Sequence, residues 1–202
     1  MKNVVLTGIG GQGTVLAAKI LAQAAQARGW HVRTAETIGM AQRGGSVTSH
    51  VRMGNCGERV ASPLVNAATA DMLIAFEPGE AARMLNLLSP DGVLVTASSV
   101  KQPVTASLSK TLYEAAPVLA ALQSRQGRTV VVDEQPLLKL AGNPKALNIV
   151  LLTVAVSQLD AAGEPLLGIS IDEFKQAIAA CVKPKFVGMN LAAVDSVLAQ
   201  IS

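Results

Sequence analysis

The chain has 202 residues, a formal net charge of +3 and a composition that is 50% hydrophobic but only 2% aromatic. A chain of this size buries roughly 70% of its surface on folding, which is enough for a single domain without disulfides or metals. The charge is mild and aromatic platforms for base stacking are scarce, so we exclude a nucleic-acid partner. Without ~18 consecutive apolar residues or a signal-peptide pattern, we expect a cytoplasmic protein with no membrane partner.

Cysteine and histidine are too sparse to form a ligand set. Cys56 and Cys181 are far apart, and neither belongs to a CxxC-like cluster. His31 and His50 are also isolated, and the simpler interpretation makes them ordinary residues of strands or strand ends. We therefore expect no disulfide and no metal or iron–sulfur ligation by this chain.

Short Val- and Ile-rich runs alternate with Ala- and Leu-rich segments of helical period. The runs predict strands at 4–7, 31–35, 47–53, 72–76, 92–96 and 129–132, with a short edge element at 60–65. The helical period predicts helices at 14–27, 79–88, 109–126, 144–159 and 171–182, with a last helix from Asn190 to Leu198. This alternation predicts an α/β fold: a Rossmann-like, open, mostly parallel sheet with helices on both faces, in a single domain spanning 1–202.

Several local signals sharpen these elements. Gly29 is a C-terminal cap, and Ser170 with Glu173 has the spacing of a capping box. Alternating apolar and polar residues predict a half-buried third strand, whereas helix 144–159 is apolar nearly all round and should be buried on several sides. Pro117 should bend the helix around it or start a second segment. Asn190 is the expected N-cap of the last helix.

A glycine-rich loop follows the first strand. Gly8-Ile9-Gly10-Gly11-Gln12-Gly13 fits G-x-G-x-x-G between a strand and a helix, where glycines allow a sharp turn and a helix N-terminus offers free N–H donors to an anion. Gly10, Gly11, Gln12 and Gly13 are thus candidate cofactor-binding residues. The alternative is that the glycines serve only close packing of helix on strand.

A self-contained NAD(P)-binding Rossmann oxidoreductase is the second hypothesis. It needs an acidic residue near the end of the second strand for the ribose hydroxyls, and Glu36 is suitably spaced from Gly13. However, a polar segment from Glu36 to Gly45 follows in place of a crossover helix. That weakens the nicotinamide hypothesis and leaves it open.

This segment contains a second glycine-rich loop, Gln42-Arg43-Gly44-Gly45. A guanidinium grips a carboxylate or phosphate through two charge-assisted hydrogen bonds, so Arg43 is a candidate catalytic residue, with Gln42, Gly44 and Gly45 as candidate cofactor-binding residues. If both loops lie at the carboxyl ends of adjacent strands, they converge on one edge of the sheet and present positive potential there. An interface salt bridge is the alternative role of Arg43.

Together these motifs resemble a known family. Gly8–Gly13, then Gly39-Met-Ala-Gln-Arg-Gly-Gly-Ser46, then Ser49-His-Val-Arg52, are similar to the gamma-type domain of pyruvate and 2-oxoacid:ferredoxin oxidoreductases. The Met-Ala-Gln-Arg-Gly-Gly variant, the length and the tail Lys183-Pro-Lys-Phe-Val-Gly-Met-Asn190 are most similar to the indolepyruvate type. The similarity covers nearly the whole chain and is most specific in its first hundred or so residues.

The resemblance implies an accessory subunit of a heteromeric enzyme that converts an aryl 2-oxoacid, indolepyruvate or a related compound, to its acyl-CoA and passes electrons to ferredoxin. It further implies a larger alpha subunit that holds thiamine diphosphate, magnesium and [4Fe–4S] clusters, with coenzyme A as co-substrate. The chain itself has no GDG-like metal motif and no cysteine cluster, so we expect it to bind none of these cofactors alone and to be inactive by itself.

A third hypothesis is a pure docking module whose glycines are structural. With few aromatic residues, a permanent subunit interface, which buries well over ~2,000 Å², must use aliphatic patches. Leu64-Val65 and Phe186–Met189 are candidates, and ordinary core packing is the alternative for each.

Overall fold

The computed structural model describes residues 1–39, 44–102 and 112–201. Six strands of these residues form one sheet in the order β2-β3-β1-β4-β5-β6. They are β1 (Lys2–Ile9), β2 (His31–Ile38), β3 (Ser46–Gly54), β4 (Ala70–Ala75), β5 (Leu88–Ala97) and β6 (Thr129–Val132). Strand β3 is antiparallel to both of its neighbours, whereas β1, β4, β5 and β6 pair in parallel. Five strands therefore run in one direction, which confirms the open, mostly parallel sheet.

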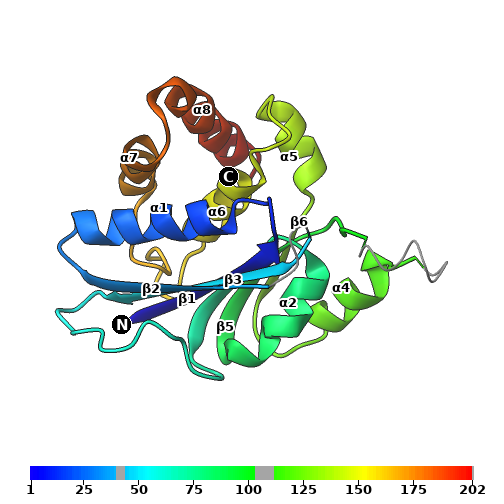
Figure 1. The fold of residues 1–202 in the computed structure, drawn as a ribbon, viewed down its shortest axis with the longest axis horizontal. Helices are drawn as coiled ribbons and strands as arrows, with labels where there is room; N and C mark the ends of the chain where they lie inside the picture. The colour runs from blue at the N-terminus through cyan, green and yellow to red at the C-terminus, as the bar shows by residue number, and fades with distance from the viewer. Residues whose placement is uncertain (40–43, 103–111, 202) are drawn as a thin grey trace.

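Helices cover both faces of this sheet, as predicted (Figure 1). One face carries α1 (Thr14–Ala27), α5 (Glu134–Leu140), α6 (Leu147–Val156), α7 (Ile171–Cys181) and α8 (Pro184–Ile201). The other carries α2 (Pro78–Met84), the 3-10 turn η1 (Leu85–Leu87) and α4 (Ala115–Gln123). In β1, Val4 and Leu6 pack into the cluster under α1, while Val5 packs into the cluster on the opposite face. Both faces of the central strands are thus buried.

Three of the predicted helix features are confirmed. Helix α1 spans the predicted range, and Gly29 follows it with φ +75° while its N–H bonds to the Gln26 carbonyl. Ser170 and Glu173 form the predicted capping box of α7. Helix α6 is buried from Asn148 to Val156, because it lies between the sheet and the other helices of its layer.

The structure corrects the predicted burial of the third strand. Thr48 and His50, expected on a solvent face, are buried. The segment that follows β3 covers His50: the backbone N–H of Val65 donates to His50 Nδ1 at 3.3 Å, and that of Val60 donates to His31 Nδ1 at 3.1 Å. Thr48 lies beside Thr7 of β1, with 3.4 Å between their hydroxyl oxygens. Residues 60–65 form no strand, so the edge element predicted there is wrong: at Val60 and Val65, N–H groups that a ladder would use are bound to histidine rings instead.

The last helix also begins elsewhere than predicted. Helix α8 starts at Pro184, a residue well suited to a first helical position because its missing N–H would have no helical acceptor. Asn190 is inside α8 and donates through Nδ2 to the Phe186 carbonyl at 2.7 Å, so it is not an N-cap. Similarly, Pro117 lies in the first turn of α4, and the part of the predicted helix at 109–111 falls outside the described residues.

Candidate functional site

The turn between β1 and α1 has the backbone conformation that its glycines permit. Gly11 and Gly13 have φ of +96° and +85°, which lie in the left-handed region that residues with a Cβ disfavour. The N–H of Gln12 closes the turn on the Ile9 carbonyl at 3.1 Å. Gly13 precedes α1 without a side-chain cap, and the N–H groups of Gly11 and Gly13 donate to no described residue. These donors are available to a ligand.

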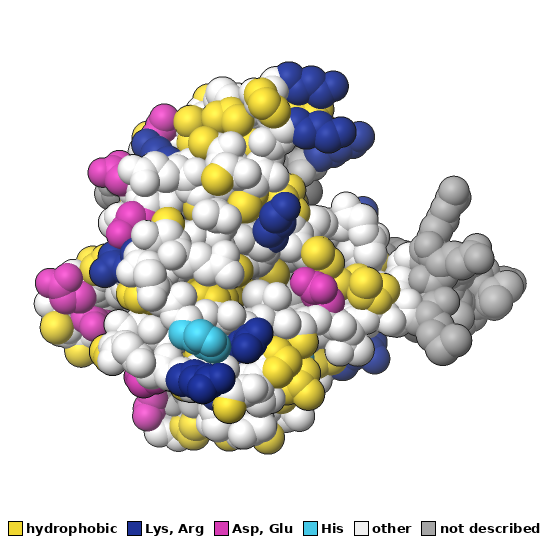
Figure 2. Space-filling view, turned by 60° about the vertical axis from the view of Figure 1, so that its left-hand side comes forward, with side chains coloured by type: hydrophobic (Ala, Val, Ile, Leu, Met, Phe, Trp, Pro, Cys, Tyr) yellow, Lys and Arg dark blue, Asp and Glu magenta, His cyan; other side chains and the backbone are white. Residues whose placement is uncertain are grey.

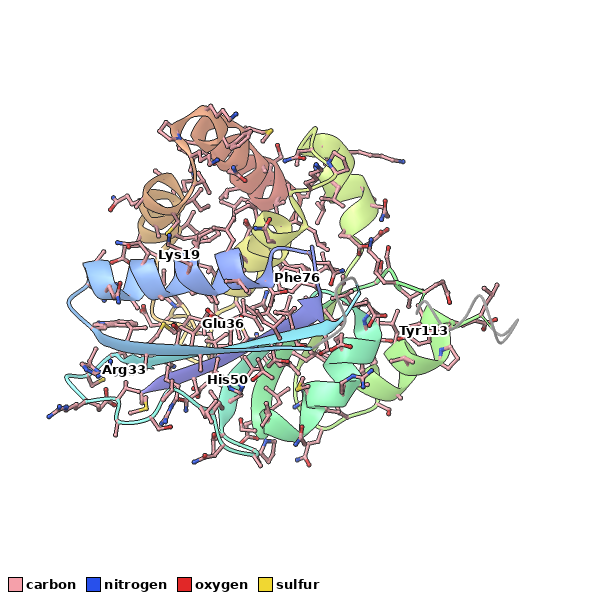
Figure 3. The ribbon with its side chains drawn as sticks, viewed as in Figure 1. Lys19, Arg33, Glu36, His50, Phe76 and Tyr113 are labelled. Atoms are coloured by element: carbon pink, nitrogen blue, oxygen red, sulfur yellow. The ribbon has the colours of Figure 1, made fainter. Side chains whose placement is uncertain are left out.

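The side chain of Gln12 makes two hydrogen bonds within the protein. Its Oε1 accepts from the Ile9 N–H at 2.6 Å, and its Nε2 donates to the carbonyl of Phe76 at 2.9 Å. Phe76 directly follows β4 and lies below the start of α1 (Figure 3). Gln12 therefore fixes the turn to the end of β4. Its structural role was not foreseen from the motif.

The two glycine-rich loops meet at the carboxyl end of β1. The Gly10 N–H donates to the Gly45 carbonyl at 2.9 Å, and Gly39 and Ser46 close the β2–β3 connection through an N–H to carbonyl bond of 2.8 Å. The loops were expected to follow adjacent strands, but β3 lies between β1 and β2. They converge because β3 is antiparallel, which brings its start beside the end of β1. Gln42 and Arg43 lie outside the described residues.

A cavity of about 600 Å³ opens where the loops meet. It is lined by the β1–α1 turn, by Gly44, by the start of α2 and by Lys101, Gln102 and Tyr113. Its charged lining residues are Glu77, Glu80, Arg83 and Lys101. We predicted a positively charged rim, but the described lining residues carry two carboxylates and two cations, so their charges balance.

Glu80 ties three elements together beneath this cavity. Its Oε2 accepts hydrogen bonds from the hydroxyl of Ser46 at the start of β3 and from Thr7 Oγ1 in β1 at 3.5 Å. Its Oε1 pairs with Arg83 Nε at 3.3 Å. Glu80 is 5% exposed, so these partners stabilise a buried carboxylate that would otherwise be costly. The network holds the second glycine loop against α2.

Glu77 and Tyr113 form an unusual pair at the cavity wall. Glu77 caps α2 by accepting from the Glu80 N–H at 2.9 Å, yet burial raises the pKa of its carboxyl. Burial, followed by the negative charge of Glu77, raises the pKa of Tyr113 to about 12. The Tyr113 hydroxyl lies close to Glu77, but neither it nor Glu77 Oε1 completes a well-aligned hydrogen bond with a described residue.

Sequence reasoning missed both members of this pair. Glu77 is the second residue after β4 and precedes Pro78 at the first position of a helix, which is a recognisable signal for a residue at the ligand-binding edge. Tyr113 had no such signal, because only the tertiary fold brings it to α2.

The structure separates Glu36, the acidic residue of the nicotinamide hypothesis, from the first glycine loop. Glu36 and Lys19 line a groove between α1 and β2, on the α1 side of the sheet, whereas Arg33 and His50 lie on the other side (Figure 3). Strand β3 stands between β2 and β1, and β2 continues to Ile38 before turning directly into β3. Glu36 to Ile38, which were expected in a loop, belong to β2. The pair of strands β2 and β3 occupies the place where a dinucleotide-binding fold has a crossover helix.

Neither a metal cluster nor a membrane span is found in the described part of the chain. Across 1–39, 44–102 and 112–201, no three His, Cys, Asp or Glu side chains are grouped as metal ligands. Cys56 and Cys181 are both free thiols. The described residues therefore do not fit an iron–sulfur cluster or a magnesium site. None of their helices is both long and apolar enough to cross a bilayer.

The fold and this edge define an α/β domain of the kind that binds ligands outside the carboxyl ends of its strands. The pyruvate ferredoxin/flavodoxin oxidoreductase signature matches residues 3–200, and the chain belongs to that family. It is 35% identical over 195 residues to the indolepyruvate oxidoreductase subunit IorB of Thermococcus kodakarensis, covering 96% of this chain and 92% of the relative. Family membership does not favour a self-contained nicotinamide enzyme.

Solved structures share the fold at low sequence identity. The gamma subunit of a keto/oxoacid ferredoxin oxidoreductase from Geobacter sulfurreducens superposes with a TM-score of 0.67 at 20% identity, covering 98% of this chain and 99% of that one. A 2-oxoglutarate:ferredoxin oxidoreductase from Magnetococcus marinus gives 0.68 at 19% identity, and there 98% of this chain matches 30% of a longer chain. The same fold thus occurs alone and as part of a larger polypeptide.

Proposed function

We propose that the chain is the accessory subunit of a heteromeric 2-oxoacid:ferredoxin oxidoreductase. The enzyme acts on an aryl 2-oxoacid such as indolepyruvate. It releases CO2, transfers the acyl group to coenzyme A and passes two electrons to ferredoxin. The single observation that carries this proposal is the 35% identity to an indolepyruvate oxidoreductase subunit over nearly the full length of both chains.

In this proposal the larger alpha subunit carries the redox chemistry in the cytoplasm. It holds thiamine diphosphate, magnesium and [4Fe–4S] clusters, and ferredoxin docks on the assembled complex. Bound there, thiamine diphosphate supplies the electron sink for decarboxylation. A [4Fe–4S] cluster is held by four cysteine thiolates, and the 202 residues include two cysteines, so in this proposal the clusters need another chain.

The contribution of this chain is the edge where the two glycine loops meet. The free N–H groups of Gly11 and Gly13 face an anionic part of coenzyme A or of the 2-oxoacid, and the Arg43 guanidinium completes the grip. Gln12 and Glu80 act as positioning residues, because their side chains are occupied in holding the two loops. The about 600 Å³ cavity has the size of a small-molecule site.

A docking module with purely structural glycines is a second candidate, which the internal engagement of Gln12 and the Gly10–Gly45 bond favours. The two candidates separate on kinetics. In the co-expressed complex, Arg43→Ala should raise KM for coenzyme A or the 2-oxoacid by about tenfold or more, as loss of a charge-assisted pair does, while assembly is unchanged. Arg43→Lys is the matched control for charge alone. Unchanged turnover and KM would remove Arg43 from the site, and parallel loss of assembly and activity would favour the docking module.

A further inference from the structure

A second cavity, of about 490 Å³, lies on the α1 side of the sheet, away from Glu77 and Tyr113. The tail motif from Lys183 to Asn190 forms one wall of it through Lys183, Phe186, Met189 and Asn190, together with Cys181 and Val182. The opposite wall is Leu16 of α1, and Asn143, Lys145 and Asn148 at the start of α6. The function proposed above makes no use of this cavity.

One wall of the cavity is the N-terminus of a buried helix. Helix α6 has ten residues and no side-chain cap, and the N–H groups of Leu147, Asn148 and Ile149 donate to no described residue. Free N–H donors and the positive end of the helix dipole favour an anion at this point. Gly13, just before α1, is packed against the Asn148 side chain.

The Asn148 side chain supplies a separate indication of a ligand. It is 6% exposed and lines the cavity, yet its amide makes no hydrogen bond with any described residue. The amide atoms are not sealed in the core, so a molecule that fills the cavity can reach them and complete their hydrogen bonds. Thr153, the other polar residue of α6, by contrast donates to the Ile149 carbonyl at 2.7 Å.

The charges and the apolar surface of the cavity specify what it takes. Among its described lining residues, Lys145 and Lys183 are the charged groups and none is a carboxylate. Neither lysine forms an ion pair with a described residue. Phe186 and Met189 are 41% and 39% exposed, so they offer apolar surface to a ligand in the cavity. In Figure 2, Lys and Arg side chains gather beside hydrophobic ones at the top of the molecule, the layer of α7 and α8.

We propose that this cavity is a binding site for an amphipathic organic anion, with its carboxylate or phosphate held by Asn148, the α6 N-terminus, Lys145 and Lys183, and its apolar body against Phe186 and Met189. The volume falls within the range of small-molecule sites. The site is distinct from the edge cavity and does not depend on the oxidoreductase assignment.

Calorimetric titration of the full chain tests the site with matched probes. 4-Phenylbutyrate and phenyl phosphate carry both the charge and the apolar body, 4-phenylbutyramide lacks the charge, and inorganic phosphate lacks the body. We expect the two anionic aryl probes to bind at least about tenfold more tightly than the amide or inorganic phosphate, because a charge-assisted contact is lost in one case and apolar burial in the other. The stronger of the two aryl probes identifies the head group. Equal binding of the neutral amide, or no binding of either aryl anion, overturns the proposal.

Variants tie the binding to these residues. Lys183→Gln, on the surface, should lower the affinity for 4-phenylbutyrate by about tenfold. Lys2→Gln, at the other end of the sheet, should leave this affinity unchanged. Asn148→Leu keeps the shape and removes the amide, so it should weaken binding without lowering the melting temperature, because the amide has no internal partner. A lower melting temperature for Asn148→Leu would give the amide a structural role, and unchanged affinity in Lys183→Gln would place the ligand elsewhere; either result contradicts the proposal.

Discussion

Gln12 joins the first glycine loop to the end of β4, because its Nε2 donates to the Phe76 carbonyl at 2.9 Å while its Oε1 accepts from the Ile9 N–H. The glutamine side chain thus stabilises the conformation of the G-x-G-x-x-G loop. The geometry of the candidate site depends on it, and beyond these two bonds the amide keeps a second N–H donor on the wall of the cavity.

Replacing Gln12 should therefore cost stability. Gln12→Met keeps the length and removes both hydrogen bonds, leaving Ile9 N–H and the Phe76 carbonyl without partners, so we expect a loss of about 1–3 kcal/mol in the free energy of unfolding. Urea denaturation measures it. Gln26→Met, on the exposed side of α1, should change it by less than about 0.5 kcal/mol. If the two variants change the free energy of unfolding equally, the Gln12 side chain does not stabilise the loop.

The glycines of this loop should differ in their tolerance of alanine. A Cβ on Gly10 would meet only the Gly45 carbonyl, at 3.6 Å, and no left-handed φ opposes it. Gly11→Ala has space but a φ of +96°, which costs about 1–2 kcal/mol. Gly13→Ala adds a contact of 3.0 Å with Asn148 to a φ of +85°. The expected order of destabilisation by thermal unfolding is Gly13, then Gly11, then Gly10, and a different order would contradict the loop geometry.

Tyr113 allows a direct measurement of its environment, because it is the one tyrosine of the 202 residues. Ultraviolet titration of the phenol should give a pKa of about 12 in the folded chain. Glu77→Gln removes the negative charge and should bring this pKa down toward its ordinary value of about 10. Circular dichroism at each pH confirms that the chain is folded. If the pKa of Tyr113 is the same in Glu77→Gln, the charge of Glu77 does not act on the Tyr113 phenol.

The pH dependence of stability should show the burial of His50. Its Nδ1 accepts the Val65 N–H, and burial lowers its pKa from 6.5. Above pH 6.5 the ring is neutral whether the chain is folded or not, so the bond contributes fully, by about 1 kcal/mol. As pH falls below that value, the unfolded chain takes up the proton first and stability is lost. In His50→Gln the amide oxygen can still accept, so the decline in melting temperature between neutral and mildly acidic pH should shrink. The same decline in both proteins would rule His50 out.

Local signals predicted the fold well where they act within a few residues. Gly13 and Gly29 bracket α1, and Ser170 with Glu173 starts α7, because capping depends only on neighbours in sequence. The antiparallel β3 was not foreseen, since a period-two pattern does not reveal strand direction. Its burial was missed for a related reason: the segment that covers His50 is irregular, and Thr48 is buried beside Thr7 of β1, a contact that no local pattern records.

The sequence predicted only one part of the candidate site. Both glycine loops were found and do meet, through Gly10 and Gly45. The acidic wall was missed, because Glu77 and Tyr113 come together through the packing beside α2, and no motif spacing records that contact. Asn190 was misjudged because a good N-cap residue was weighed without the competing first-position preference of Pro184.

Reconstitution with a thiamine- and cluster-bearing large subunit tests the central claim most directly. We expect that neither chain alone forms acyl-CoA from an aryl 2-oxoacid, and that the mixture does so while reducing ferredoxin. Oxidation of the 2-oxoacid by this chain alone with a nicotinamide nucleotide, or full activity of the large subunit without it, would contradict the account.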